Sequence, residues 1–152
     1  KHGGHPKAAG FTLPIAHIDA FQERMNEAVA RVANPESLIP KHIYTLEILT
    51  EGLVLELTSE LKKLGPFGIG NRRPHFLIKN VRPTRIRTLS EGKHLKFQIN
   101  GRGRPIDVIW WNEGERASTF ETATLDLLGT LSVNEWQGRK SLQVLLVDAR
   151  HH

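Results

Sequence analysis

Hydrophobic and polar positions follow two different periods along this chain, and the first of them is helical. From residue 18 to residue 32, apolar side chains recur every three or four positions, at Ile18, Phe21, Met25, Val29 and Val32. This spacing places them on one face of a helix. The pattern predicts a helix that follows Pro14 and His17, packs its apolar stripe into a core and ends at Asn34-Pro35.

Residues 43–73 form a transition between the two patterns. Residues 43–49 alternate as a strand does, and Leu57, Leu61 and Leu64 predict a helix over 54–64 that Gly65-Pro66 ends. The glycines from Gly65 to Gly70 have no leading strand, no following helix and no Lys-Ser/Thr pair, so they do not indicate a nucleotide-binding loop. We interpret residues 67–74 as a rigid turn that joins the two parts.

From His75 onward the period is two, which is typical of short strands. The pattern predicts strands over 76–79, 84–89, 94–99 and 106–111, a short helix or loop over 113–122, and a final hairpin over 125–136 and 142–147. Five or six short strands with one inserted helix favour a small closed barrel, and an OB-like barrel is the natural choice. The predicted fold class is therefore α+β, with a partial α/β part over 1–73 and an all-β OB-like barrel over 74–152.

Composition limits the classes of partner that the chain is expected to bind. The 152-residue chain has a formal net charge of +5 and contains no cysteine. A basic balance favours a polyanionic partner, although an ordinary solvated surface is the alternative. The chain has no signal-peptide pattern and no apolar run of the length that a membrane span needs. The absence of cysteine excludes a disulfide framework and fits an intracellular protein. Because it starts at Lys1, we expect it to be a fragment, and His151 and His152 are candidate tag remnants.

The first eleven residues combine small residues and cations. Consecutive glycines let a ligand approach the backbone, and histidine and lysine add hydrogen bonds to anionic oxygens. This makes a candidate phosphate-contacting loop of Gly3, Gly4, His5 and Lys7. The alternative is a glycine turn that leads into Phe11.

Three motifs carry a family resemblance. GGHPKAAGF at residues 3–11, LGPFGIGN at 64–71 and NEWQGRKSLQ at 134–143 together resemble the DHH phosphoesterase superfamily, and within it the C-terminal part of RecJ-like exonucleases. The resemblance covers nearly the whole chain. It implies that residues 1–73 are the C-terminal part of a DHH-associated substrate-binding domain. One departure is His2, which stands where some members carry a third glycine.

The resemblance also implies an activity for the intact enzyme. Such enzymes hydrolyse single-stranded DNA from the 5′ end in repair and recombination, in the cytoplasm, with manganese or magnesium. They hold the metal in an upstream domain. In agreement, the four aspartates here are scattered and no Asp-His-His triplet is present. We therefore expect no catalytic residue, no metal site and no nuclease activity in this fragment.

The barrel supplies the second candidate site. Single-stranded DNA is held by a cationic groove with aromatic platforms. The candidates are Arg85, Arg87, Lys93, His94, Lys96, Arg102, Arg104, Trp111, Trp136, Arg139 and Lys140. Trp110 shares a face with Ile106 and Val108 and is expected in the core, and Trp136 can pack against either DNA or the junction. Lys96 is the leading phosphate contact, so Lys96→Glu is expected to weaken binding and flatten its salt dependence.

Two other functions compete with this one. The chain can instead be a non-catalytic OB-like module that recruits a helicase or a single-strand-binding protein through its basic surface. A phosphodiesterase acting on small nucleotides is disfavoured, because such an enzyme has no obvious use for a barrel after Asn71.

Overall fold

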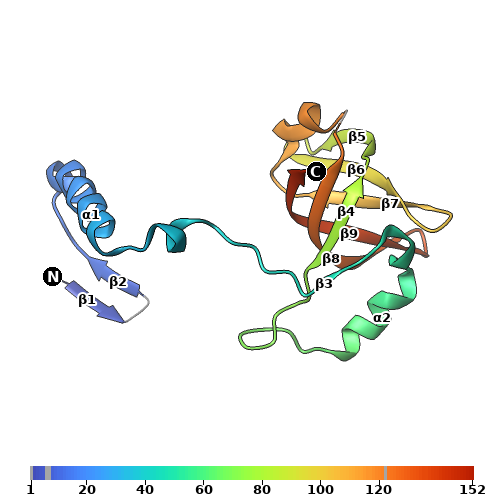
Figure 1. The fold of residues 1–152 in the computed structure, drawn as a ribbon, viewed down its shortest axis with the longest axis horizontal. Coiled ribbons are helices and arrows are strands. Elements are labelled where there is room, and N and C mark those ends of the chain that lie inside the picture. Colours follow the sequence, from blue (N-terminus) through green and yellow to red (C-terminus); the bar gives the residue numbers. More distant parts are fainter. Residues whose placement is uncertain (1, 6–7, 122) are drawn as a thin grey trace. The chain divides into compact units, whose positions relative to one another are not determined.

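The computed structural model describes residues 2–5, 8–121 and 123–152. The chain divides into two compact units, Lys1–His42 and Ile43–His152. In Figure 1 the first unit is blue to cyan, and the second runs from teal through green and yellow to red. The division lies earlier than the boundary near residue 73 that the sequence predicted. Residues 43–73 belong with the barrel because the strand and the helix that they contain pack on its sheet.

The first unit is a hairpin followed by a helix. Strands β1 (His2–His5) and β2 (Ala8–Phe11) are antiparallel, with Gly3 opposite Gly10. The turn η1 (Ile15–His17), the helix α1 (Ile18–Val32) and the turn η2 (Pro35–Leu38) follow. The predicted helix is confirmed, and it ends just before Asn34-Pro35 as expected.

The apolar stripe of α1 does not lie in a core, which differs from the sequence prediction. Phe21 packs on Phe11 with ring centroids 4.4 Å apart, but Ile18, Met25 and Val29 are exposed. A two-stranded ribbon is too small to cover a helix of this length, so the unit leaves an apolar face open.

The second unit is a seven-stranded sheet that curls into a barrel (Figure 1). Its strands run in the order β3-β4-β8-β9-β7-β6-β5. Their bounds are β3 Leu46–Glu47, β4 Phe76–Val81, β5 Thr84–Leu89, β6 His94–Asn100, β7 Pro105–Trp110, β8 Leu125–Trp136 and β9 Arg139–His151.

The two ends of this sheet are joined by the chain itself. Arg82 and Pro83 link β4, which pairs with β8, directly to β5, which pairs with β6. Counted as one bent strand, β4 and β5 close a five-stranded barrel in which β7 and β9 are the parallel pair. This is the arrangement of an OB-fold, and it confirms the predicted α+β class with an OB-like barrel.

The barrel has one core, and the period-two pattern produces it. Leu95, Phe97 and Ile99 alternate inward along β6 and meet Trp110, Val108 and Ile106 of β7 in register. The turn η4 (Gly114–Phe120) adds Phe120, which stacks on Trp110 with ring centroids 5.9 Å apart. Trp110 is therefore a core residue, as the sequence predicted.

Residues 43–73 cover one side of this barrel. The helix α2 (Leu55–Lys63), preceded by η3 (Thr50–Gly52), packs Leu57 and Leu61 against the core and confirms the predicted helix. The predicted strand over 43–49 shortens to the two residues of β3, which pair in parallel with β4. Asn71 closes the turn after α2 by donating from Nδ2 to the carbonyl oxygens of Leu64 and Pro66.

Candidate nucleic-acid interface

The outer face of β6 and β7 is the polar side of the barrel. Alternation turns His94, Lys96 and Gln98 outward while their neighbours fill the core. The register places Lys96 beside Ile109 and Gln98 beside Asp107, and Gln143 of β9 follows Asp107 in the same row. In an OB-fold, this face and the loops at its borders bind oligonucleotides.

Lys96, the leading phosphate contact from the sequence, is paired with a carboxylate. Its Nζ lies 2.6 Å from Asp107 Oδ2, and Gln98 donates to Asp107 Oδ1 at 2.8 Å. Partial burial acts to raise the pKa of Asp107, but the hydrogen bonds from Lys96 and Gln98 outweigh it, and the pKa lies below its usual value. The carboxylate therefore stays ionised at neutral pH and offsets the charge of Lys96.

One end of the outer face carries an exposed aromatic corner. Trp111 follows β7 directly and is 50% exposed. Its ring meets the edge of His94 with centroids 4.7 Å apart, and the Asn112 amide donates to His94 Nδ1 at 3.0 Å, which fixes the imidazole. Lys93 lies in the loop before β6 at the same end, so three of the predicted residues are brought together here.

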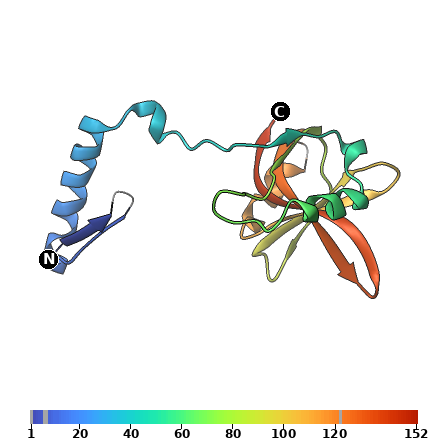
Figure 2. The ribbon, with the colours of Figure 1, turned by 90° about the horizontal axis from the view of Figure 1, so that it is seen from below.

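The β8–β9 hairpin forms the opposite end. Gln137 and Gly138 have φ values of 48° and 73°, as a tight two-residue hairpin turn requires. This turn sets Trp136 directly opposite Arg139 at the tip, and Trp136 is 71% exposed. Figure 2 shows the hairpin, orange to red, projecting from the barrel.

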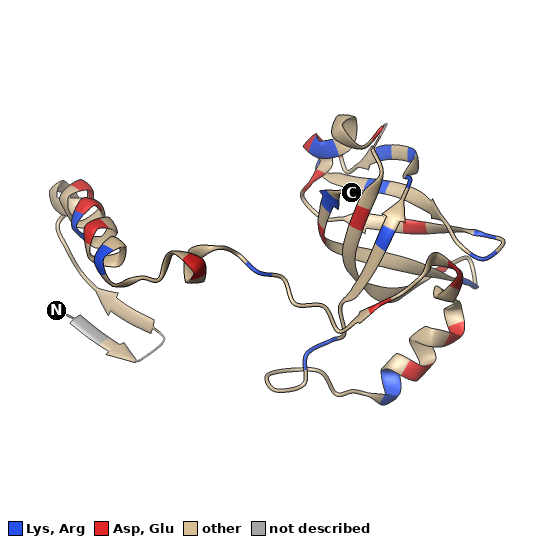
Figure 3. Cartoon of the chain, in the orientation of Figure 1, with Lys and Arg blue, Asp and Glu red and all other residues tan. Residues whose placement is uncertain are grey.

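Of the other predicted cations, Arg87 pairs with Lys96 in register and continues its row onto β5, while the rest border the face. Arg102 and Arg104 belong to the β6–β7 loop, at the hairpin end of the strands, and Arg85 and Arg87 lie on β5, which borders β6. Lys140 lies one step behind the hairpin tip, 3.6 Å from Glu135. Figure 3 shows blue Lys and Arg positions on the loops and strands of the second unit, with red Asp and Glu positions among them.

The glycine motif is a strand, not the loop that the sequence suggested. Gly3, Gly4 and His5 lie on β1, while Lys7 lies outside the described residues. A Cβ built on Gly4 would make only ordinary contacts, at 3.5 Å from Ala8 O and Ala9 Cβ. The hairpin itself therefore does not require a glycine at position 4.

Metal-ligating residues do not gather in the described part of the chain. Among residues 2–5, 8–121 and 123–152, there is no group of three or more histidine or acidic side chains that could hold a metal ion. These residues thus do not fit a manganese or magnesium centre. No helix among them is long and apolar enough to cross a membrane.

Sequence reasoning missed Asp107 and Gln143. Both lie in the centre of the outer face, where Asp107 is between Gln98 and Gln143 in one row. The signal for Asp107 was present: the four residues between Asn100 and Pro105 fix the hairpin register, which sets Asp107 opposite Gln98. The position of Gln143 depends on the parallel pairing of β7 and β9, which local sequence does not specify.

Known proteins resemble this chain over almost its whole length. It is 32% identical over 97% of its residues to the single-stranded-DNA-specific exonuclease RecJ of Bacillus subtilis, and 35% identical over 99% to that of Thermus thermophilus. Solved structures of Thermus thermophilus RecJ with Mn²⁺ and with Mg²⁺ each match all of it at a TM-score of 0.72 and 32% identity.

The match is to a part of these proteins. The chain spans 19% and 21% of the lengths of the Bacillus and Thermus relatives, in their C-terminal part. The family model described as the RecJ OB domain matches residues 44–148, which is the second compact unit almost end to end. The chain therefore belongs to the RecJ OB domain family.

Proposed function

We propose that this chain is the strand-guiding part of a RecJ-like 5′–3′ single-stranded-DNA exonuclease. The observation that carries the proposal is the pair of exposed tryptophans, Trp111 and Trp136, at opposite ends of the polar outer face. Exposed rings stack on bases whatever their sequence, which suits an enzyme that follows a strand.

The charges on and around the outer face suggest how the DNA strand lies on it. Asp107 is an ionised carboxylate in the middle of the face and repels phosphates. The neighbouring Gln98 and Gln143 offer neutral hydrogen bonds instead. We infer that bases cross the centre of the face, while the backbone follows the cations at its border, Lys93, Arg87 and Arg139.

The glycine motif would supply the second contact with DNA. Because a side chain at Gly4 fits the hairpin, the small residue is better explained by something that approaches the strand closely, such as a phosphate. His5, which is exposed at the end of β1, could hydrogen-bond the same phosphate. This role is proposed for Gly3, Gly4 and His5 in the intact enzyme.

Catalysis would belong to the rest of the parent enzyme. The described residues do not form a metal centre, whereas the Thermus RecJ structures hold Mn²⁺ or Mg²⁺. We therefore assign hydrolysis, in DNA repair and recombination, to a parent that binds the metal elsewhere. The residues here would bind and orient the strand.

The deciding experiment is fluorescence anisotropy of a labelled single-stranded oligonucleotide titrated with this chain at two salt concentrations, beside a duplex of the same sequence. We expect binding that prefers the single strand and weakens as salt rises. Absence of binding at low salt would contradict the proposal and favour a module that recruits a helicase or a single-strand-binding protein.

A further inference from the structure

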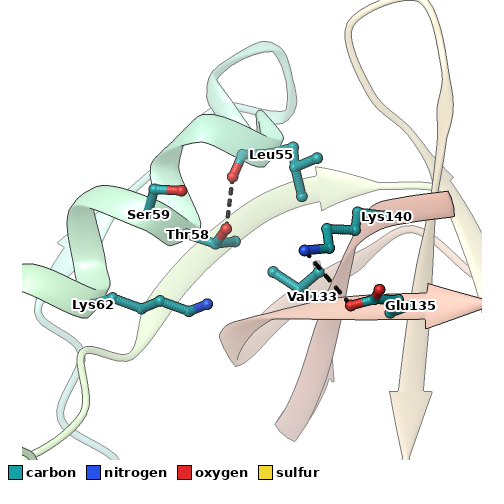
Figure 4. Close-up of a pocket in the computed structure, with 7 residues that line it drawn as sticks. All are labelled: Leu55, Thr58, Ser59, Lys62, Val133, Glu135 and Lys140. Atoms are coloured by element: carbon teal, nitrogen blue, oxygen red, sulfur yellow. Dashed lines mark hydrogen bonds and ion pairs between the residues drawn. The ribbon is translucent and has the colours of Figure 1, made fainter. Parts of the chain in front are cut away.

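A groove lies on the side of the barrel away from the outer face, between α2 and the β8–β9 hairpin. A cavity of about 380 Å³ there is lined by Leu55, Thr58, Ser59, Lys62, Val133, Glu135 and Lys140. Figure 4 shows the Lys62 side chain extending from α2 toward the strands, with Lys140 reaching in from β9. Helix α2 and strand β9, which are far apart in the sequence, thus each place a lysine in the same cavity.

A second cavity continues this groove. It measures about 280 Å³, shares Leu55 and Lys140 with the first, and adds the arginines of the β6–β7 loop, Arg102 and Arg104. The rest of its lining comes from the start of α2 and from the strands, namely Leu53, Val54, Glu56, Pro105, Ile106, Ser141 and Leu142. The groove therefore runs along α2 from Lys62 to the β6–β7 loop.

The lining is cationic overall. Four cations, Lys62, Lys140, Arg102 and Arg104, face two carboxylates, Glu56 and Glu135. Within the described part of the chain, Lys140 pairs with Glu135 at 3.6 Å, while Lys62 and the two arginines make no ion pair within 4 Å. Such a groove attracts an anion with several spaced charges.

The hairpin tip connects this groove to the outer face. Trp136 and Arg139 are opposite each other at the tip, and the next pair inward is Glu135 with Lys140. Successive pairs of a strand ladder point to opposite faces. A DNA strand that stacks on Trp136 therefore reaches Lys140 by passing around the tip of the hairpin.

We propose that the groove holds the phosphodiester backbone of the same single strand beyond Trp136, with Lys62 and Lys140 as phosphate contacts. This inference rests on the proposed function and extends it by a second segment of the DNA path. The groove suits a phosphate backbone better than an acidic peptide. The apolar side chains that line the two cavities are all aliphatic, so the groove lacks the aromatic anchors that dominate binding at many protein interfaces.

The test uses two oligothymidylates, one of about 6 and one of about 16 nucleotides, within the range of site sizes of OB-folds. Lys62→Gln removes the proposed contact. Lys63→Gln is the matched control, because Lys63 is the next residue of α2 but is bound to Glu60 at 2.8 Å. Lys62→Gln should weaken binding of the long oligonucleotide and lower its salt slope by about 0.7, the contribution of one phosphate, and leave the short one unchanged.

The outcomes separate this inference from the proposed function. If Lys62→Gln binds the long oligonucleotide as Lys63→Gln does, while Trp136→Ala weakens both lengths, the groove is not on the DNA path but the function stands. If neither oligonucleotide binds and a polyglutamate peptide binds in a Lys62-dependent way, the groove is a peptide site, and both proposals fail. Thermal unfolding of each variant verifies that it folds.

Discussion

At the scale of single residues, Asp107 decides how the outer face can meet a polyanion. Its carboxylate accepts from Lys96 and Gln98, and these hydrogen bonds hold its pKa below the usual value despite partial burial. An ionised carboxylate beside neutral bases lowers the affinity for DNA little, whereas one beside phosphates repels them. If the proposed function holds, the Lys96–Asp107 pair should make Lys96 a weaker phosphate contact than the sequence predicted.

Asp107→Asn should consequently strengthen single-strand binding at neutral pH and steepen its salt dependence. The amide oxygen can still accept from Lys96, and the amide NH₂ can donate to Gln98 once that side chain turns its oxygen toward it. The face then keeps its geometry, while the charge of Lys96 is no longer offset and can hold one phosphate. We expect the salt slope to rise by about 0.7, measured by anisotropy at several salt concentrations. Asp19→Asn on α1 makes the same change in net charge in the other compact unit, and an equal gain there would contradict the local explanation.

Asp126 is a structural carboxylate that ties three strands together. Its side chain is buried and accepts hydrogen bonds from the Asn80 amide, from Arg150 and, with Nδ1 as donor, from His152. Burial acts to raise the pKa of Asp126, but these hydrogen bonds outweigh it, and the pKa lies below its usual value of 3.8. The stabilisation is therefore present above pH 3.8 and is lost as the pH falls through the lower pKa of the folded state.

Asp126→Asn should lower the free energy of unfolding at pH 7 by about 1–3 kcal/mol, because a neutral amide replaces a hydrogen-bonded charge. The difference from the unsubstituted chain should shrink in acid, as the pH falls from 3.8 through the lower pKa of the folded state. Urea unfolding at pH 7 and in this acid range measures both effects. Glu51→Gln, at an exposed position, should change neither, and a constant difference at all pH values would argue against the assigned pKa.

At the scale of elements, the β8–β9 hairpin combines a tight turn with an exposed aromatic side chain. Its turn needs positive φ at Gln137 and Gly138, and that geometry holds Trp136 against Arg139 in solvent. The ring makes little contribution to the core because it is mostly exposed. A tryptophan kept in water on a rigid hairpin is well suited to stack on a base.

Trp136→Ala should therefore weaken single-strand binding by about 1–3 kcal/mol, which is roughly 5- to 150-fold in Kd, and leave the thermal midpoint unchanged. Ile69→Ala is the control, since Ile69 is also a large exposed apolar residue but lies in the turn after α2. A fall in the midpoint without a loss of affinity would mean that Trp136 packs against protein, which was the alternative for this residue.

The elements also show what sequence could and could not predict. Leu95, Phe97 and Ile99 fixed the inner face of β6, and the turn at Gly101 fixed its partner strand, because alternation and hairpin geometry are local. The strand predicted over 43–49 was longer than the observed β3, because the pairing of β3 depends on β4, which is thirty residues away. The stripe of α1 correctly predicted a helix, but periodicity does not say what covers the helix.

At the scale of the molecule, the boundary between the units follows from where the core lies. Every buried residue of the core cluster lies between Leu53 and Leu146, and Leu55, Leu57 and Leu61 of α2 pack against it. The rigid turn at 67–74 joins α2 to β4 inside one compact unit. A glycine- and proline-rich turn therefore marked a connection within a domain here, not a domain boundary.

A chain that starts at Ile43 should then fold as the full chain does. Since the core cluster loses no member, its thermal midpoint should be unchanged, and its single-strand binding should persist because both tryptophans remain. Removing 1–42 also removes the exposed stripe of α1, so self-association, measured by sedimentation, should decrease. A chain that starts at Asn71, near the boundary that the sequence predicted, lacks α2 and should unfold at lower temperature. If it instead matched the longer chain, residues 43–70 would be dispensable and the sequence boundary would be the physical one.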